Sequence, residues 1–199
     1  MLHIYKEGKK GAPVFIVLHG TGGTEHDLIP LAEMLNEEYG VLSIRGNVQE
    51  GGMNRYFKRH GEGQYDLEDL EFRGKELLDF IKESAEKYDF KTEDAIPVGF
   101  SNGTNIAINM ILRDECDFKK ALLFAPLYPV DLSDNNKDLS DFKAFLSTGR
   151  GDPMVPEDES ERVVEIFRER GADVRHTWVN GHSLPQEAAM EAKDWLNES

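Results

Sequence analysis

The stretch that most constrains the fold of this chain is residues 95–107, where an apolar segment, a serine flanked by glycines and a second apolar segment follow one another. Its centre, residues 99–103, reads Gly-Phe-Ser-Asn-Gly, the pattern G-x-S-x-G. Where a strand turns sharply into a helix, this pattern lifts the serine hydroxyl above the sheet edge, and a Cβ at either glycine would crowd the helix against the strand. Ser101 is therefore the candidate nucleophile. The alternative is a glycine-rich turn with an incidental serine, because the pattern alone is only moderately specific.

Strand-like and helix-like segments alternate along the rest of the chain. This alternation predicts a doubly wound, mostly parallel sheet flanked by helices, in a single domain that spans residues 1–199. Pro97 is expected at the first paired position of its strand, or where its missing N–H does no harm. The expected strands are 2–6, 14–18, 41–45, 95–98, 120–125, 142–148 and 173–179, and the expected helices are 28–35, 67–88, 106–111, 156–171 and 184–196.

The chain carries 38 acidic and 23 basic residues, which gives a formal net charge of −15 at pH 7. Such a charge opposes binding to nucleic acid and stable association with anionic membranes, so we expect neither partner. The only cysteine, Cys116, excludes an internal disulfide and lies among acidic residues that disfavour a thiolate, so we interpret it as structural or incidental. No apolar run approaches the length of a membrane span and the N-terminus has no apolar targeting segment, so a cytoplasmic location is expected.

The glycine-rich loop at residues 19–24 follows the first long apolar run and precedes a helix. Gly20 and Gly22 match the start of the dinucleotide fingerprint G-x-G-x-x-G, and Arg45 would suit a 2′-phosphate. The third glycine position holds Glu25, however, whose carboxylate beside a helix N-terminus would repel a pyrophosphate. The other use of such a loop is as half of an oxyanion hole, because glycines leave a backbone N–H free to face the neighbouring serine turn.

The segment 46–66 has no sustained periodicity and contains five glycines. A connection this long in a compact domain is more often functional than not. Two interpretations stay open for its side chains: they are solvated and pair with nearby acids, or they form a wall of the substrate site. On the second interpretation Met53, Tyr56 and Phe57 contact the substrate. The basic cluster interleaved with these three consists of Arg55, Lys58, Arg59 and His60.

Thr21, Ser101, Asp152 and His182 all follow the carboxyl ends of predicted strands. In open α/β sheets, chemistry gathers beyond those ends. A neutral serine hydroxyl is a poor nucleophile, so a base has to take its proton. His182 is the candidate base, and Asp152 is the candidate carboxylate that holds the imidazole tautomer. The chain order Ser, Asp, His therefore predicts a catalytic triad.

The other histidines fit this chemistry less well. His176 lies inside the last predicted strand, where a core or surface role is expected, and His19 is interpreted as a structural hydrogen-bonding residue. No pair of residues has a metal-ligand spacing such as H-E-x-x-H, so neither a metal nor another cofactor is expected.

These motifs resemble those of the bacterial phospholipase/carboxylesterase family, relatives of acyl-protein thioesterases in the α/β-hydrolase superfamily. The resemblance covers nearly the whole chain, and residues 45–46 and 55–57 are similar to a bacterial subgroup associated with quinone-stress operons. It implies an α/β-hydrolase fold of minimal size, without a cap domain. It also implies that the backbone N–H groups of Thr21 and Asn102 form the oxyanion hole. The residues that carry it are 19–23, 99–107, 151–153 and 181–182.

The expected activity is that of a serine carboxylesterase acting on small, short-acyl carboxylic esters through an acyl-enzyme. A thioesterase or a lysophospholipase would use the same triad, and a non-catalytic small-molecule binder of the same fold is the alternative from another class. A nicotinamide oxidoreductase is disfavoured by Glu25. The expected partner is a small ester substrate, and a homodimer is left open.

Overall fold

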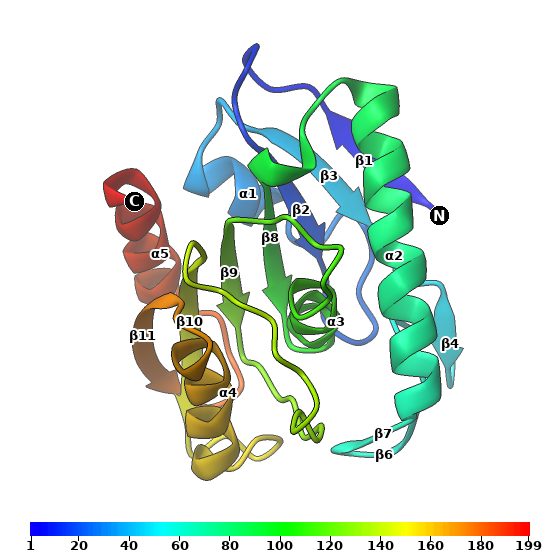
Figure 1. Ribbon diagram of the computed structural model, residues 1–199, viewed down its shortest axis with the longest axis vertical. Helices are drawn as coiled ribbons and strands as arrows, with labels where there is room; N and C mark the ends of the chain where they lie inside the picture. The colour runs from blue at the N-terminus through cyan, green and yellow to red at the C-terminus, as the bar shows by residue number, and fades with distance from the viewer.

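The computed structural model describes residues 1–199 and is organised around a seven-stranded sheet with the order β1-β3-β2-β8-β9-β10-β11 (Figure 1). Neighbouring strands pair in parallel from β3 to β11, and only the edge strand β1 is antiparallel to its neighbour. The predicted mostly parallel sheet is confirmed. Its strands are β1 (His3–Lys6), β2 (Val14–Leu18), β3 (Gly40–Ile44), β8 (Ala95–Phe100), β9 (Lys120–Phe124), β10 (Lys143–Arg150) and β11 (Asp173–Asn180).

The predicted helices are also present, and helices cover both faces of the sheet. Alternate side chains of β2 point to opposite faces: Ile16 packs into the larger of two apolar clusters, and Val17 packs into the smaller one. The larger cluster includes residues of α2, α3 and α4, and the smaller one includes residues of α1 and α5. The helices are α1 (Ile29–Leu35), α2 (Leu67–Tyr88), α3 (Asn102–Ile111), α4 (Glu157–Glu169) and α5 (Gln186–Glu198), with a short 3-10 turn, η1 (Thr92–Asp94).

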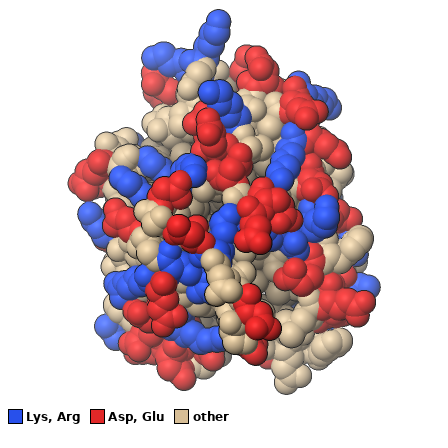
Figure 2. Space-filling view, in the orientation of Figure 1, with Lys and Arg blue, Asp and Glu red and all other residues tan.

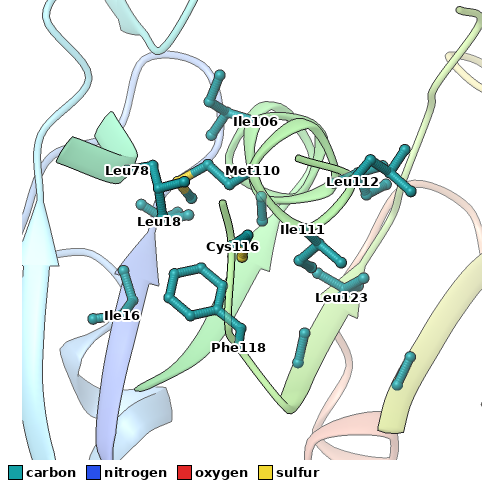
Figure 3. Packing of buried hydrophobic residues seen from close by; sticks show 14 of the residues in the cluster. Ile16, Leu18, Leu78, Ile106, Met110, Ile111, Leu112, Cys116, Phe118 and Leu123 are labelled. Carbon is teal, nitrogen blue, oxygen red and sulfur yellow. The ribbon is translucent and has the colours of Figure 1, made fainter. Parts of the chain in front are cut away.

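The larger cluster fixes α3 against the sheet. Figure 3 shows Leu18 of β2, Met110 of α3 and Leu78 of α2 pointing toward one another. All three side chains are almost completely buried. Because α3 begins directly after Ser101, this packing also fixes the position of the candidate nucleophile.

Pro97 lies in the middle of β8, opposite Ile16 of β2, and not at the first paired position. The pairing of β8 with β9 begins only at Val98. The proline therefore precedes the ladder on the β9 side, where its missing N–H does no harm.

The segment 46–66, which showed no periodicity in sequence, forms two short antiparallel hairpins. Strands of two or three residues are too short to produce a periodic signal. Asp66 ends the segment and caps α2, because its carboxylate accepts the N–H of Asp69 at 3.0 Å. The four strands are β4 (Val48–Glu50), β5 (Met53–Arg55), β6 (Arg59–Gly61) and β7 (Gln64–Tyr65).

The other long connection, residues 126–141, contains no helix or strand, so no cap follows β9. Figure 2 shows Lys and Arg interspersed with Asp and Glu over the face drawn, so that face carries no continuous basic stripe. None of the helices is both long enough and apolar enough to span a membrane.

Candidate active site

Ser101 occupies a strained turn between β8 and α3. Its backbone angles are φ 52° and ψ −114°, in the positive-φ region that residues with a Cβ rarely adopt. The two flanking glycines are required by close packing. A Cβ on Gly99 would lie 2.7 Å from the Thr104 nitrogen, and one on Gly103 would collide with the carbonyl oxygen of Leu18. The strand-to-helix turn expected from residues 95–107 is confirmed.

The structure brings Ser101, Asp152 and His182 into one hydrogen-bonded chain. His182 Nε2 lies 2.9 Å from Ser101 Oγ, and His182 Nδ1 lies 2.7 Å from Asp152 Oδ2. A carboxylate only accepts, so Nδ1–H donates to Asp152 and leaves Nε2 to accept the Ser101 hydroxyl proton. The Asp152 side chain is 1% exposed and that of His182 is 15% exposed. This is the arrangement that a serine nucleophile and a general base require.

Strand register places the aspartate and histidine turns side by side. Arg150 and Asn180, the last residues of β10 and β11, are partners in the parallel ladder. Gly149 permits the close approach, because a Cβ there would collide with the carbonyl oxygen of Gly181. Asp152 is held further by the N–H groups of Met154 and Val155, which donate to its Oδ1 at 2.7 and 3.2 Å.

Two backbone N–H groups are available next to Ser101. Asn102 is the first residue of α3, so its N–H has no acceptor within the helix. Thr21 follows β2, the strand beside β8, and its N–H donates to no protein acceptor, whereas Gly22 and Gly23 both donate to backbone carbonyls. Thr21, Ser101 and Asn102 line one cavity. The pair fits an oxyanion hole.

His19 orients the loop that carries Thr21. Its Nε2 accepts the N–H of Gly46 at 3.0 Å, so Nδ1 carries the proton and donates to the Gly20 carbonyl at 2.6 Å. That carbonyl belongs to the same rigid peptide unit as the Thr21 N–H, so its hydrogen bond fixes the direction of the N–H. Burial lowers the pKa of His19, which favours the neutral form that these two bonds require. The structural role expected for His19 is confirmed.

Glu25 and Arg45, the two residues on which the nucleotide-binding alternative depended, form an ion pair with each other. The Glu25 carboxylate accepts Arg45 Nε at 2.5 Å and Arg45 Nη2 at 3.1 Å. Arg45 is therefore already paired with a carboxylate and is poorly placed to bind a 2′-phosphate. Residues 20–25 therefore form a loop held by an ion pair, and this pairing disfavours a dinucleotide-binding site.

The positions of Tyr56 and Phe57 differ from the expectation that these side chains contact the substrate. Both are buried, at 3% and 0% exposure, and neither lines the cavity beside Ser101. The Tyr56 hydroxyl donates to the Ile44 carbonyl at 2.6 Å and accepts the His19 N–H at 2.9 Å, so its role is to support the site from beneath. Met53 is 43% exposed and lies outside the cavity lining. Because Arg55, Tyr56 and Phe57 are buried in succession, this stretch has no alternating pattern from which the directions of the two aromatic side chains could be predicted.

The basic cluster of the segment 46–66 divides into two pairs. Lys58 and His60 are exposed, whereas Arg55 is buried, Arg59 is half-buried, and both of these arginines line the cavity beside Ser101. The cavity holds about 40 Å³, which suits a small group and not a long acyl chain. Sequence reasoning assigned no substrate contact to several of its lining residues: Tyr65, Asn105, Ala125, Leu127, Met154 and Val155.

The sequence predicts neither a nucleophilic role for Cys116 nor a bound metal ion. Burial raises the pKa of the Cys116 thiol to about 11, which disfavours the thiolate that a nucleophile requires. Figure 3 shows the residue within the apolar cluster near Phe118. No group of three or more His, Cys, Asp or Glu side chains is arranged to hold a metal ion.

No family model matches the chain, but comparison with individual known proteins identifies its family. The "Putative hydrolase MhqD" of Bacillus subtilis (strain 168) is 38% identical over 200 residues, which cover 100% of this chain and 99% of that protein. The crystal structure of the Bacillus cereus carboxylesterase is 40% identical, with a TM-score of 0.95 over 98% of this chain and 93% of that one. A structure of YahD with malic acid is 36% identical, with a TM-score of 0.94 over 98% of each chain. The chain therefore belongs to the phospholipase/carboxylesterase-type α/β-hydrolases.

Proposed function

We propose that this hydrolase is a serine carboxylesterase that cleaves small, short-acyl carboxylic esters through an acyl-enzyme. The observation that carries the proposal is the hydrogen-bonded chain from Ser101 through His182 to Asp152, beside two free backbone N–H groups. The 40% identity to the Bacillus cereus carboxylesterase supports the same reaction class. The YahD structure is described with malic acid, a small carboxylic acid, which is the class of product this reaction releases.

Each residue of the site then has a defined role in the reaction. Ser101 Oγ attacks the ester carbonyl while His182 Nε2 takes the hydroxyl proton, and Asp152 stabilises the imidazolium that forms. The N–H groups of Thr21 and Asn102 bind the developing oxyanion. The tetrahedral intermediate collapses, the alcohol leaves with the proton from His182, and the acyl group remains on Ser101. Water, deprotonated by His182, then attacks the acyl-enzyme and releases the acid.

The small cavity and the uncovered site support short substrates. The connection 126–141, where a cap would be inserted, has no helix and no apolar face that closes over a lipid. The cavity of about 40 Å³ beside Ser101 accommodates only a few carbon atoms. Long acyl chains would lie across the surface and gain less from burial.

Labelling with a fluorophosphonate tests the proposal, because only an activated serine reacts readily with this reagent. We expect one equivalent of label on the peptide that contains Ser101, and no label on Ser101→Ala. Ser183→Ala is the matched control, since Ser183 adjoins His182 and its hydroxyl donates to the Asn180 carbonyl at 2.8 Å, outside the triad. The absence of label on the folded wild-type protein, or label on another serine, would contradict the proposal.

A further inference from the structure

Two arginines face the cavity beside Ser101 in a protein whose net charge is −15. Arg55 ends β5 and its side chain is only 4% exposed, and Arg59 begins β6 with its side chain 17% exposed. Placing two guanidinium groups together in a partly desolvated site is unfavourable unless anions compensate them. Burial and the nearby Arg59 both lower the pKa of Arg55.

One carboxylate serves both arginines. Glu50 Oε2 lies 3.2 Å from Arg55 Nε and 3.0 Å from Arg59 Nε. Glu62 also faces the cavity, but it lies on an exposed hairpin end and pairs with neither arginine. The group formed by Arg55, Glu50 and Arg59 therefore keeps about one unit of positive charge.

The guanidinium groups also keep unused donors. Arg55 donates through Nη1 to Thr21 Oγ1 at 2.6 Å and through Nε to the Phe57 carbonyl at 3.2 Å, but its Nη2 donates to no protein group. Arg59 donates only through Nε, to Glu50, and both of its Nη atoms are free of protein acceptors. These donors lie in the lining that also contains Ser101 and Thr21.

We propose that Arg59, supported by Arg55, binds a carboxylate of the substrate, so that the preferred esters are monoesters of small dicarboxylic acids. The inference rests on the proposed esterase activity and specifies its substrate class. A planar guanidinium with two free Nη groups matches a carboxylate in a bidentate geometry. The residual charge of about one unit balances a single carboxylate. Arg59 and Ser101 line the same cavity of about 40 Å³, so a carboxylate on Arg59 would lie only a few bonds from the scissile carbonyl.

The test compares two esters of the same size and shape, monoethyl glutarate and the ethyl ester of glutaric acid monoamide. At pH 7 the first carries a carboxylate and the second a neutral carboxamide, so kcat/KM for acid release measures recognition of the charge. We expect the wild-type protein to prefer the carboxylate by roughly 10-fold to 100-fold, the worth of a hydrogen bond to a charged group. In Arg59→Gln this ratio should fall to near one, and Arg59→Lys should recover part of it.

Lys58→Gln is the matched control. Lys58 is the neighbour of Arg59 in the chain, its side chain is exposed and it does not line the cavity, so this variant removes one positive charge without touching the proposed subsite. The wild-type ratio should persist in this variant. A wild-type ratio near one, or an equal loss for both esters in Arg59→Gln, would overturn the carboxylate subsite while leaving the esterase intact. Hydrolysis of neither ester by wild-type protein, together with no fluorophosphonate label on Ser101, would instead overturn the proposed function.

Discussion

Two regions of the molecule meet at Ser101 and are built in different ways. The strand-end region comprises the turns after β8, β10 and β11, and ladder register fixes its positions. The hairpin segment 46–66 is held by buried polar contacts, such as the Tyr56 hydroxyl on Ile44 and His19 and the Arg55 guanidinium on Thr21. The proposed chemistry therefore depends on the strand ends, whereas the proposed recognition of the substrate depends on the hairpin segment. Changes in the first region should abolish turnover, and changes in the second should alter stability or substrate choice.

The largest effect is expected in the strand-end region. Ser101→Ala and His182→Ala should each lower kcat/KM for p-nitrophenyl acetate by about 10⁴-fold or more, and Asp152→Asn should cost as much or less. Because the three groups act as a unit, the double variant of Ser101 and His182 should be little worse than either single one. Wild-type turnover by Ser101→Ala would remove the serine from the mechanism.

The contrast between the regions also explains what the sequence could predict. Ser101, Asp152 and His182 each follow a buried strand, and parallel strands bring their carboxyl ends to one edge of the sheet. Motif and position were therefore sufficient to place them. Tyr56 and Phe57 lie in the connection between β5 and β6, and strands as short as these give no periodic signal from which the side-chain directions could be predicted.

Long-range packing explains why the residues that line the cavity could not be identified from the sequence. The burial of Arg55 depends on Thr21 Oγ1, 34 residues away in the chain, and the Tyr65 hydroxyl donates to the Leu127 carbonyl across 62 residues. No local sequence pattern indicates contacts between residues so far apart in the chain. The division of the basic cluster into the cavity-lining pair, Arg55 and Arg59, and the exposed pair, Lys58 and His60, has the same cause.

Thr21 links the two regions, and its variants should separate them. Thr21→Pro deletes the N–H donor and should lower kcat by roughly 10²-fold. Thr21→Ala keeps the N–H but leaves the buried Arg55 Nη1 without its acceptor, so it should lower the free energy of unfolding by about 1–3 kcal/mol. Its effect on kcat should be much smaller than that of Thr21→Pro.

Thr21→Ser is the control, since it retains both the N–H and a hydroxyl acceptor for Arg55. Enzyme kinetics and denaturant unfolding should be measured on all three variants. Equal losses of kcat in Thr21→Ala and Thr21→Pro would show that the side chain, and not the backbone donor, is what the reaction needs.

Tyr56→Phe should test the supporting role of the hairpin segment. The change leaves the Ile44 carbonyl and the His19 N–H without their buried partner, so the free energy of unfolding should fall by about 1–3 kcal/mol. Tyr39→Phe is the matched control, because the Tyr39 hydroxyl makes no hydrogen bond within the protein and its loss should stay within about 0.5 kcal/mol. An altered acyl-chain preference in Tyr56→Phe without loss of stability would restore Tyr56 as a substrate wall.

The smallest effect is expected when the acyl chain of the substrate is lengthened by one methylene. Each methylene that enters the cavity should improve kcat/KM by up to about 0.8 kcal/mol in transition-state free energy, and the gain should stop once the cavity is full. Since the cavity holds only about 40 Å³ and residues 126–141 supply no lid, that limit should be reached at short chains.

A series of p-nitrophenyl esters from acetate to palmitate, assayed below and above micelle formation, measures this limit. The net charge of −15 discourages docking on anionic lipid surfaces, and an open site has no lid for an interface to displace, so the rate should not jump at the micelle boundary. An optimum at long chains or such a jump would mean that a lipid-binding surface exists outside the cavity. The lysophospholipase alternative would then take precedence, and the hairpin segment, with exposed Met53 beside Gly22, would be the first place to look for that surface.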